Sequence, residues 1–347
     1  MRITSLLKIL IAVAIGAVWF FGGSTPEPAA PAKSSSIDAW LAPQDWQKRR
    51  DAPVITLGLE GAFDDMHVFA PAVVREKGLY RLWYPGSRGT VAGRVFRIGL
   101  ATSSDGVRFK KAAKNPVYSF GGAESIVTPT VLRNTDGTPI REDGKLRMWF
   151  TSVDFSDGIH SLHDSLSSDG VAWSAPSESL LDNVYAPTVI KDGSIYRMWY
   201  TDVGVPSWTI RHASSPDGKT WNVTPKPVLE VEQNWEHRRL FYPTVVKHDG
   251  LYLLWYASYW IEAPDADKTG IGFAVSEDGI HWRKNPNNPV LRPDSDLLWE
   301  AYYNSSQSVM RLPDGTWRIW YGSRKEPPFI NKYFAIATAT WTGPKGN

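Results

Sequence analysis

One passage occurs five times along the chain, with some variation. Residues 184–204 read VYAPTVIKDGSIYRMWYTDVG, which is an apolar segment with a proline inside it, a polar turn, and a second segment that ends in Trp-Tyr. The same order of features returns at residues 68–86, 126–152, 240–258 and, more loosely, 302–323. Short segments with period-two alternation, separated by turn residues, predict β-strands. Each copy is therefore a predicted β-hairpin.

Two further predicted strands follow each hairpin. A third segment such as RIGLATS (residues 97–103) leads into a Ser-x-Asp-Gly turn, which begins at Ser103, Ser167, Ser215 and Ser276. Asp-Gly supplies the positive φ that a tight hairpin turn requires, so these turns are interpreted as structural. A fourth segment then leads to Pro-Val, as in residues 282–291.

The repeating unit has a nearly constant length. The prolines of the first four copies lie 58, 58 and 56 residues apart, at Pro71, Pro129, Pro187 and Pro243. Four-stranded units at such a period, with Trp and Asp-Gly signatures, are typical of a β-propeller. A β-sandwich also has short strands, but it gives no reason for the whole unit to recur in phase. The predicted fold class is all-β, a five-bladed β-propeller of four-stranded antiparallel blades.

The fifth copy stops after its third strand, and a matching fourth strand lies at the other end of the chain. Residues 46–55 (WQKRRDAPVI) match residues 282–291 (WRKNPNNPVL). An N-terminal strand that completes the last blade closes the ring and removes an exposed edge. The propeller is predicted over residues 40–342, with blades at about 62–118, 119–181, 182–229, 230–292, and 293–341 together with 44–55.

The first 23 residues form a separate segment. Two basic residues precede an uninterrupted apolar run at residues 9–21, which is typical of a secretory signal peptide. If it is not cleaved, the run serves as an N-terminal membrane anchor, with the Pro/Ala/Ser-rich residues 24–39 as a linker. The protein is predicted to be exported, either periplasmic or secreted.

Composition limits the kinds of molecule that the protein is expected to bind. A formal net charge of +2 over 347 residues argues against nucleic acid, and against a membrane surface bound through charge, as partners. The chain has no Cys, which excludes disulfides, thiolate chemistry and Cys-based metal sites. It has 17 Trp, and indole faces commonly stack on sugar rings. A carbohydrate is therefore the predicted partner, and the oligomeric state stays open.

Function is expected on one end of the ring. The short hairpin turns share one end, while the segments that enter strand one share the other end with the long loops after Trp-Tyr. An acidic residue precedes strand one in every copy, and the candidate catalytic carboxylates are Asp64, Asp65, Glu124, Asp182 and Glu236. Candidate substrate-binding side chains at the same end are Arg88, Asp202, Trp208, His237, Arg238, Arg239, Trp260, Glu300 and Arg324.

A funnel of carboxylates and aromatic rings suits glycosidic bond hydrolysis. One carboxyl group protonates the leaving oxygen, and another activates water or attacks the sugar. Asp65 or Asp64 is the predicted base, and Glu124, Asp182 and Glu236 share the acid and tuning roles. The alternative is that these residues cap turns or bind a structural cation in the channel. No cofactor is predicted to be required, and no metal ligands are assigned.

The repeated GxYRMWY and SxDGxxW text resembles the five-bladed propeller glycoside hydrolases, the superfamily of families 43, 32, 62, 68 and 130, which are arabinanase-, levansucrase- and invertase-like. In family 43 the base lies in blade one, a tuning acid in blade two and the general acid in blade three. By position the resemblance places these roles on Asp64 or Asp65, Glu124 and Asp182.

One departure and one candidate match bear on the choice of family. Phe69-Ala70-Pro71 stands where family 32 has its Asn-Asp-Pro triplet, which argues against an invertase. Family 130 phosphorylases use one acid and a basic phosphate pocket, for which Arg238, Arg239 and Lys325 are candidates. The leading hypothesis is an exported glycoside hydrolase acting on a poly- or oligosaccharide. The alternatives are a non-catalytic saccharide-binding or scaffold propeller and a glycoside phosphorylase.

Overall fold

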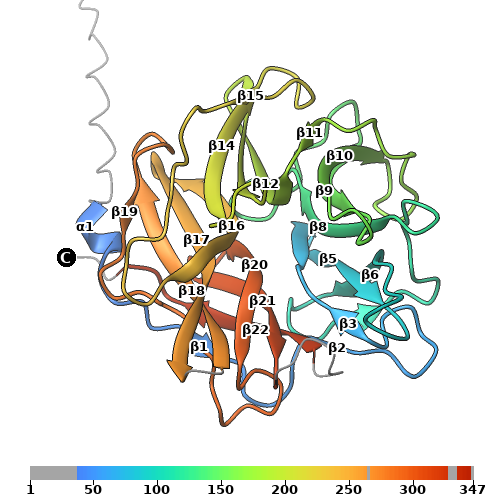
Figure 1. Cartoon of the computed structure of the whole chain (residues 1–347), viewed down its shortest axis with the longest axis horizontal. Helices are drawn as coiled ribbons and strands as arrows, with labels where there is room; N and C mark the ends of the chain where they lie inside the picture. The colour runs from blue at the N-terminus through green and yellow to red at the C-terminus, as the bar shows by residue number, and fades with distance from the viewer. Residues whose placement is uncertain (1–36, 264–265, 327–333, 345–347) are drawn as a thin grey trace, which may run out of the picture. The chain divides into compact units, whose positions relative to one another are not determined.

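Five antiparallel sheets surround a common centre in the computed structural model, which describes residues 37–263, 266–326 and 334–344 (Figure 1). This arrangement confirms the predicted five-bladed β-propeller. The signal segment predicted at residues 1–23 and most of the predicted linker lie outside the described residues. Within the described part of the chain, no helix is both long enough and apolar enough to span a membrane.

The blades follow one another along the chain. Blade one contains β3 (His67–Val68), β4 (Ala72–Glu76), β5 (Leu79–Ser87), β6 (Arg97–Ser103) and β7 (Lys110–Lys111). Blade two contains β8 (Ser125–Val131), β9 (Leu146–Val153), β10 (His160–Ser167) and β11 (Leu181–Asp182). Blade three contains β12 (Val184–Asp192), β13 (Ile195–Asp202), β14 (Thr209–Ser215) and β15 (Asn222–Val223).

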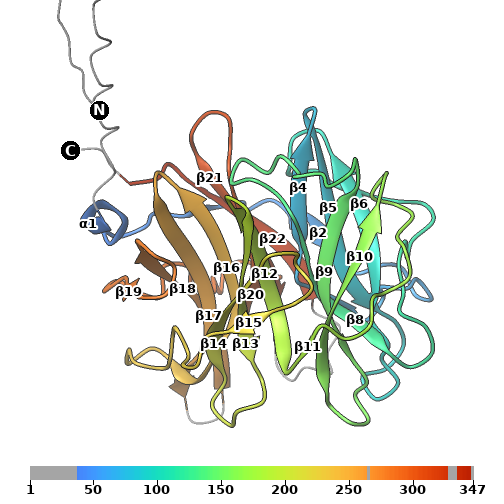
Figure 2. The same ribbon diagram turned by 90° about the horizontal axis from the view of Figure 1, so that it is seen from above.

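Blade four contains β16 (His237–His248), β17 (Leu251–Ala263), β18 (Ala266–Ser276) and β19 (Arg283–Lys284). Blade five contains β20 (Tyr303–Arg311), β21 (Trp317–Arg324) and β22 (Phe334–Trp341), and the N-terminal strands β1 (Gln47–Lys48) and β2 (Ile55–Thr56) complete it. In the perpendicular view the connections between strands gather at the two opposite ends of the blades (Figure 2).

The ring closes as predicted. Gln47 of β1 pairs with Thr340 of β22, and Ile55 of β2 pairs with Ile336 of the same strand. The outer strand of blade five therefore comes from the N-terminal end of the propeller, and β22 has no open edge along these residues. Closure of this kind ties the first and last segments of a propeller together.

A short helix, α1 (Ile37–Trp40), spans the boundary predicted between the linker (residues 24–39) and the propeller, and its Trp40 side chain is buried. Its ring packs edge-on against Trp317 and Trp341 of blade five and stacks on Phe273 of blade four. The Trp40 side chain therefore belongs to the propeller core, because an indole buried between two blades contributes apolar contacts that a linker does not.

Indole hydrogen bonds join neighbouring blades. The Trp of each Trp-Tyr or Trp-Phe pair in blades one, two, three and five donates from Nε1 to the glycine carbonyl of the next blade's Asp-Gly turn, at 2.8–2.9 Å. The pairs are Trp83 with Gly170, Trp149 with Gly218, Trp199 with Gly279, and Trp320 with Gly106. The recurring Trp and the recurring Asp-Gly turn are thus two halves of one contact, which explains why they repeat together.

Blade four provides a natural control for this contact. The Nε1 of Trp255 has no hydrogen-bond partner among the described residues, although this ring is as fully buried as that of Trp149. We expect Trp149→Phe to lower the free energy of unfolding by about 1–3 kcal/mol more than Trp255→Phe, because only the former leaves a buried carbonyl without its donor. Urea denaturation of the two variants measures the difference, and equal losses would contradict the assigned contact.

The Asp-Gly turns are structural, as predicted. In blade three the Asp217 carboxylate accepts hydrogen bonds from the backbone N–H groups of Lys219 and Thr220, both at 2.8 Å. The bond from Thr220 is the main cause of the lowered pKa of Asp217. Asp105 and Asp169 accept equivalent backbone bonds, which likewise lower the pKa of each carboxyl group.

Because of these turns, we expect the folded state to lose stability in acid. A carboxyl group whose pKa is lower in the folded than in the unfolded state stabilises the fold above its unfolded pKa, and this contribution disappears as the pH falls. We therefore expect the urea midpoint to fall as the pH is lowered from about 5 to about 2. Asp217→Asn, which keeps an oxygen acceptor but cannot titrate, should make that fall shallower. An unchanged pH dependence in this variant would contradict the role of the turn.

The first strand of every blade carries a bulge at the same place. One residue there has a positive φ between 42° and 53°, although none of the five is a glycine: Ala70, Thr128, Ala186, Tyr242 and Ser306. At three of these positions the backbone N–H donates at 3.1 Å to a hydroxyl group of the preceding blade. These bonds offset the cost of an unfavourable backbone conformation, which is about 1–3 kcal/mol per residue. The bulges also set the shape of the channel mouth.

Candidate functional site

Three of the predicted acidic residues belong to one repeated buried cluster. In blade one, Asp64 accepts hydrogen bonds from the Tyr84 hydroxyl (2.9 Å) and from Nζ of Lys111 (2.5 Å). The tyrosine comes from the second strand and the lysine from the fourth. The Asp64 side chain is only 2% exposed, and the cluster therefore ties the entry segment of the blade to its outer strand.

Blades four and five contain the same cluster. Glu236 accepts from the Tyr256 hydroxyl (2.6 Å) and from Nζ of Lys284 (2.7 Å), and it also receives two backbone N–H bonds. Glu300 accepts from the Tyr321 hydroxyl (2.6 Å) and pairs with Lys48 of the closing strand β1. Both carboxylates have fully buried side chains. Burial raises the pKa of Glu300, against the opposing effect of Lys48.

The prediction that Asp64 and Glu236 act in a central funnel, and that Glu300 binds substrate there, disagrees with this arrangement. Each carboxylate is held by a lysine and a tyrosine of its own blade instead of facing the channel mouth. A buried carboxylate needs such partners, because a charge without them is strongly destabilised. The repetition that suggested a converging ring of acids reflects a repeated structural contact.

Two other predicted acids also lie away from a shared site. Asp65 is buried and accepts hydrogen bonds from the backbone N–H groups of Gly61 and Gly89, at 2.8 and 2.9 Å. Asp182 was expected at the entry to blade three, but it lies in β11, the outer strand of blade two. Its exposed side chain accepts from the hydroxyl groups of Ser161 and Ser179. Asp182 therefore does not lie at the entry to blade three, and the catalytic role predicted for Asp65 stays a prediction.

Glu124 differs from the other four candidates. It lies immediately before β8 and is half-buried. Its carboxylate makes no hydrogen bond or ion pair with any other described residue, whereas Asp64, Asp65, Asp182 and Glu236 each have partners. It is therefore the one predicted catalytic carboxylate that the described contacts leave available for a ligand.

An aromatic pocket of about 280 Å³ occupies the end of the ring where function was predicted. Its wall is made by the bulged first strands together with the loops that follow the second strands. Every blade contributes an aromatic side chain to it, although in blade two this side chain comes from the loop after the second strand. The aromatic side chains are Phe69, Phe96, Phe155, Tyr185, Trp208, Tyr242, Tyr303 and Phe334. Among the side chains that the structure describes, no carboxylate lines this pocket.

Apart from two arginines, the polar side chains of the pocket are neutral hydrogen-bonding groups at neutral pH. The hydroxyls of Tyr185 and Tyr242 are 2.5 Å apart, and burial raises the pKa of both phenols. His160 donates from Nδ1 to the Gly158 carbonyl (2.9 Å), so Nε2 is left as an acceptor. Burial lowers the pKa of His160, which favours this neutral form. These groups suit the hydroxyl groups of a neutral ligand.

Arginines complete the pocket and its rim. The Arg94 guanidinium lies 3.9 Å from the centre of the Phe155 ring, and that of Arg324 lies 4.7 Å from the Tyr303 ring. Both line the pocket. The guanidinium of Arg239, which does not line the pocket, lies 4.2 Å from the centre of the Trp208 ring and stabilises this indole by a cation–π contact.

The predicted binding residues are therefore divided. Trp208 and Arg324 line the pocket, and Arg239 contacts it through Trp208. The others do not line it: Arg88 and Arg238 are exposed, Asp202 pairs with Arg211, His237 begins β16, Trp260 stacks with Arg292, and Glu300 is in its buried cluster. Lys325, a candidate for a phosphate pocket, is not among the lining residues either.

One pattern in the sequence does point to the pocket residues, namely the variable positions just before the repeated proline. Phe69 and Tyr185 stand two positions before the proline of their copies, and Tyr242 stands one position before Pro243. These positions form the bulge in each first strand, and their identity varies between copies. Residues that change within an otherwise constant repeat were the better indication of the site.

No metal site is indicated within the described part of the chain. It contains no group of three or more His, Asp or Glu side chains close enough to hold an ion. The structural cation that the sequence allowed in the channel stays an untested expectation, and the chemistry available in the aromatic pocket is stacking and hydrogen bonding.

Comparisons with known proteins give distant relatives. No model of a known protein family matches the chain. The uncharacterized proteins MT1551 and Rv1502 of two Mycobacterium tuberculosis strains are each 28% identical over 242 residues, which are 65% of this chain and 76% of the relative. The A type blood N-acetyl-α-D-galactosamine deacetylase of Flavonifractor plautii is 23% identical over 202 residues, 54% of this chain but only 26% of that protein.

Solved structures show the fold. A glycosyl hydrolase from Bacteroides ovatus superposes with a TM-score of 0.68 at 15% identity, over 89% of this chain and 96% of that one. The chain has the fold of glycoside hydrolases. A thermostable family-43 glycoside hydrolase superposes with a TM-score of 0.60 at 19% identity, over 84% and 100% of the two chains.

A third structure represents the GH130 family of mannoside phosphorylases, which contains glycoside hydrolases that target β-1,2 mannosidic linkages. It superposes with a TM-score of 0.66 at 15% identity, over 86% of this chain and 94% of that one. The resemblance to propeller glycoside hydrolases, inferred from the repeated text, is thus confirmed for the fold.

Proposed function

We propose that the protein recognises a carbohydrate in the aromatic pocket at the channel mouth. The observation that carries this proposal is the composition of that pocket, in which Phe69, Trp208 and Tyr303 surround the hydrogen-bonding groups of His160 and Tyr185. Sugar rings offer C–H faces that stack on aromatic rings, and hydroxyl groups that pair with phenols and imidazole. A pocket that is mainly apolar with a few placed polar groups is the usual form of a small-ligand site.

The relatives support the ligand class more than any one reaction. Their names describe glycoside hydrolases, a family of mannoside phosphorylases and a deacetylase of N-acetylgalactosamine. The chemistry differs among these proteins, but each acts on a carbohydrate. A shared fold does not fix the reaction, which depends on the groups in the site. Carbohydrate recognition is therefore the part of the function that the fold and the pocket both support.

Glycosidic bond hydrolysis is the second candidate, and the neighbouring glycoside hydrolases favour it. Most such enzymes need two carboxyl groups beside the scissile bond. Glu124 is available for one role, since its carboxylate has no described partner. Asp64 and Glu236 are not proposed for the other, because each is held by a lysine and a tyrosine.

A glycan array followed by product analysis tests both candidates. The propeller is applied to the array, and the glycans it binds are then incubated with it for a long period, with and without inorganic phosphate. Binding without products supports a recognition protein, and products support an enzyme, phosphate-dependent if it is a phosphorylase. If products form, Glu124→Gln should reduce their rate by at least about a hundredfold, as expected for loss of an acid or base. Absence of binding to any glycan would overturn the proposal.

We further propose that the protein is exported, because the apolar run at residues 9–21 follows two basic residues. Fractionation of the producing cells and N-terminal sequencing of the product test this. A mature N-terminus beyond residue 23 supports a cleaved signal, an intact N-terminus in the membrane fraction supports an anchor, and a cytosolic product would overturn export.

A further inference from the structure

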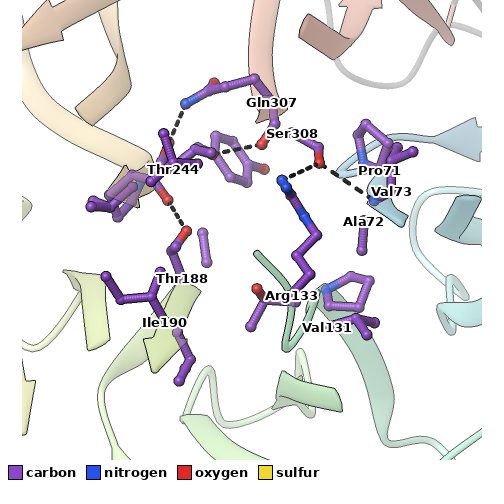
Figure 3. A pocket seen from close by; sticks show the side chains of 18 of the residues that line it. Pro71, Ala72, Val73, Val131, Arg133, Thr188, Ile190, Thr244, Gln307 and Ser308 are labelled. Atoms are coloured by element: carbon purple, nitrogen blue, oxygen red, sulfur yellow. Dashed lines mark hydrogen bonds between the residues drawn. The ribbon is translucent and has the colours of Figure 1, made fainter. Parts of the chain in front are cut away.

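A second cavity, of about 260 Å³, lies inside the central channel (Figure 3). The first strands of all five blades line it, and it adjoins the aromatic pocket, since Tyr242 and Ser306 border both. The two cavities differ in chemistry. The channel cavity has few aromatic groups, and Figure 3 shows the Arg133 side chain extending into it toward Ser308.

Arg133 is held in the channel by an unusual connection. The other first hairpins turn within a few residues, but in blade two a longer connection joins β8 to β9. Thr135 of this connection accepts a backbone bond from Arg311 of blade five (2.9 Å) and donates from Oγ1 to the Lys247 carbonyl of blade four (2.7 Å). Gly137 accepts from the Arg75 backbone N–H of blade one (2.8 Å). The connection therefore crosses one end of the channel and is fixed to three other blades.

The hydrogen bonds of Arg133 leave part of its guanidinium available. Nη2 donates to the Val309 carbonyl (2.6 Å) and weakly to Ser308 Oγ (3.5 Å), and Nη1 donates to the Asn134 carbonyl (3.2 Å). A guanidinium has five N–H donors, so the N–H on Nε and one on Nη1 have no described acceptor. The Ser308 hydroxyl accepts from Val73 N–H (3.4 Å) as well, and its own hydrogen has no described acceptor. Donors from two blades thus face the cavity.

The charge of Arg133 is not compensated within the described chain. It forms no ion pair with any described carboxylate, and no described carboxylate lines the cavity. The two lysines at the same end are different, because Lys191 pairs with Glu142 (3.0 Å) and Lys247 with Asp192 (2.5 Å). Burial lowers the pKa of Arg133 to about 10, against the opposing effect of Asp136, so the group remains charged at neutral pH.

We propose that the channel cavity binds a small inorganic anion, held by the guanidinium of Arg133 and the hydroxyl group of Ser308. Arg133 is half-buried, and a charge that is partly removed from water without a counter-charge is destabilised, so an anion from solution reduces that cost. Chloride is the ion that ordinary solutions supply. The proposal concerns the channel and is independent of the carbohydrate proposed for the aromatic pocket.

Bromide is a suitable probe because it substitutes for chloride and scatters anomalously. Crystals of the wild-type protein soaked in sodium bromide should show an anomalous peak within hydrogen-bonding distance of Arg133. A map with no peak in the channel would overturn the proposal. This experiment needs no variant, so it stands even if a substitution of Arg133 fails to fold.

Thermal unfolding tests the role of Arg133 in solution. In halide-free, low-salt buffer the Tm of the wild type should rise as sodium bromide is added, because an ion that binds the native state stabilises it. Arg133→Met should lose this rise, with an affinity for bromide at least tenfold lower. Arg108→Met, which removes an exposed arginine, should keep it. The same response in the wild type and in Arg133→Met, or no rise in the wild type, would overturn the proposal.

Discussion

Replacing Trp208 with alanine is expected to weaken carbohydrate binding by about thirtyfold or more. Removal of a central aromatic side chain from a binding site commonly costs 2 kcal/mol or more, and about 1.4 kcal/mol corresponds to a factor of ten in the dissociation constant. Trp208 lines the aromatic pocket and contacts the Arg239 guanidinium and the Tyr185 ring. Calorimetric titration with the glycan that gives the strongest array signal measures the effect.

Trp260 provides a matched control for this substitution. It is half-buried like Trp208 and also lies under an arginine, because the Arg292 guanidinium is 5.3 Å from its ring centre. It does not line the aromatic pocket. Trp260→Ala should therefore change the dissociation constant by less than about threefold, whereas a loss equal to that of Trp208→Ala would show that the ligand lies elsewhere.

Replacing Glu236 with alanine is expected to lower the free energy of unfolding by about 3–5 kcal/mol, the usual cost of removing one partner from a buried ion pair. The substitution leaves the buried Lys284 ammonium with only the exposed and more distant carboxylate of Glu232 (3.7 Å), and it leaves the Tyr256 hydroxyl without its acceptor. Because whole domains are stable by only about 5–15 kcal/mol, the loss should be obvious in a urea denaturation curve.

Asp182→Ala is the control for the buried cluster. Its carboxylate is exposed and accepts only from two serine hydroxyl groups, so the free energy of unfolding should change by less than about 1 kcal/mol. The structural assignment of Glu236 would be contradicted by a Glu236→Ala variant that keeps wild-type stability and loses turnover of a glycan. That result would restore Glu236 as a catalytic residue.

The fold could be predicted because four of the five blades use the same residues for the same contact. The Trp of one blade and the Asp-Gly turn of the next recur together since they form one hydrogen bond, as in Trp83 with Gly170. The closing strand could be predicted for a similar reason: Trp46 and Trp282 each stand immediately before an outer strand, β1 and β19. Such contacts depend on the local spacing of residues, which the sequence displays directly.

The site could be predicted only in part, because an acidic residue that repeats in several blades can reflect a repeated structural contact instead of convergence on one site. Asp64, Glu236 and Glu300 recur because each pairs with a lysine from the fourth strand of its blade. That lysine stands two positions after an aromatic residue in each copy, so the pairing was visible in the sequence. Trp208 and Arg324, two of the predicted binding residues, line the aromatic pocket, and their role in binding stays a prediction.

The remaining pocket residues depend on backbone geometry that residue types alone do not specify. Phe69, Tyr185 and Tyr242 reach the channel mouth because the first strands are bulged there, with positive φ values at non-glycine residues. A period-two strand without a bulge places alternate side chains on opposite faces, so the bulge changes which residues face the pocket.

The crystal structure of the protein with the glycan selected on the array is the most direct test of the account. We predict a sugar ring in the aromatic pocket, stacked on an aromatic side chain such as Trp208 and hydrogen-bonded to His160 or to the Tyr185 and Tyr242 pair. A glycan bound outside this pocket, with Asp64 or Glu236 released from its lysine to contact the sugar, would contradict it.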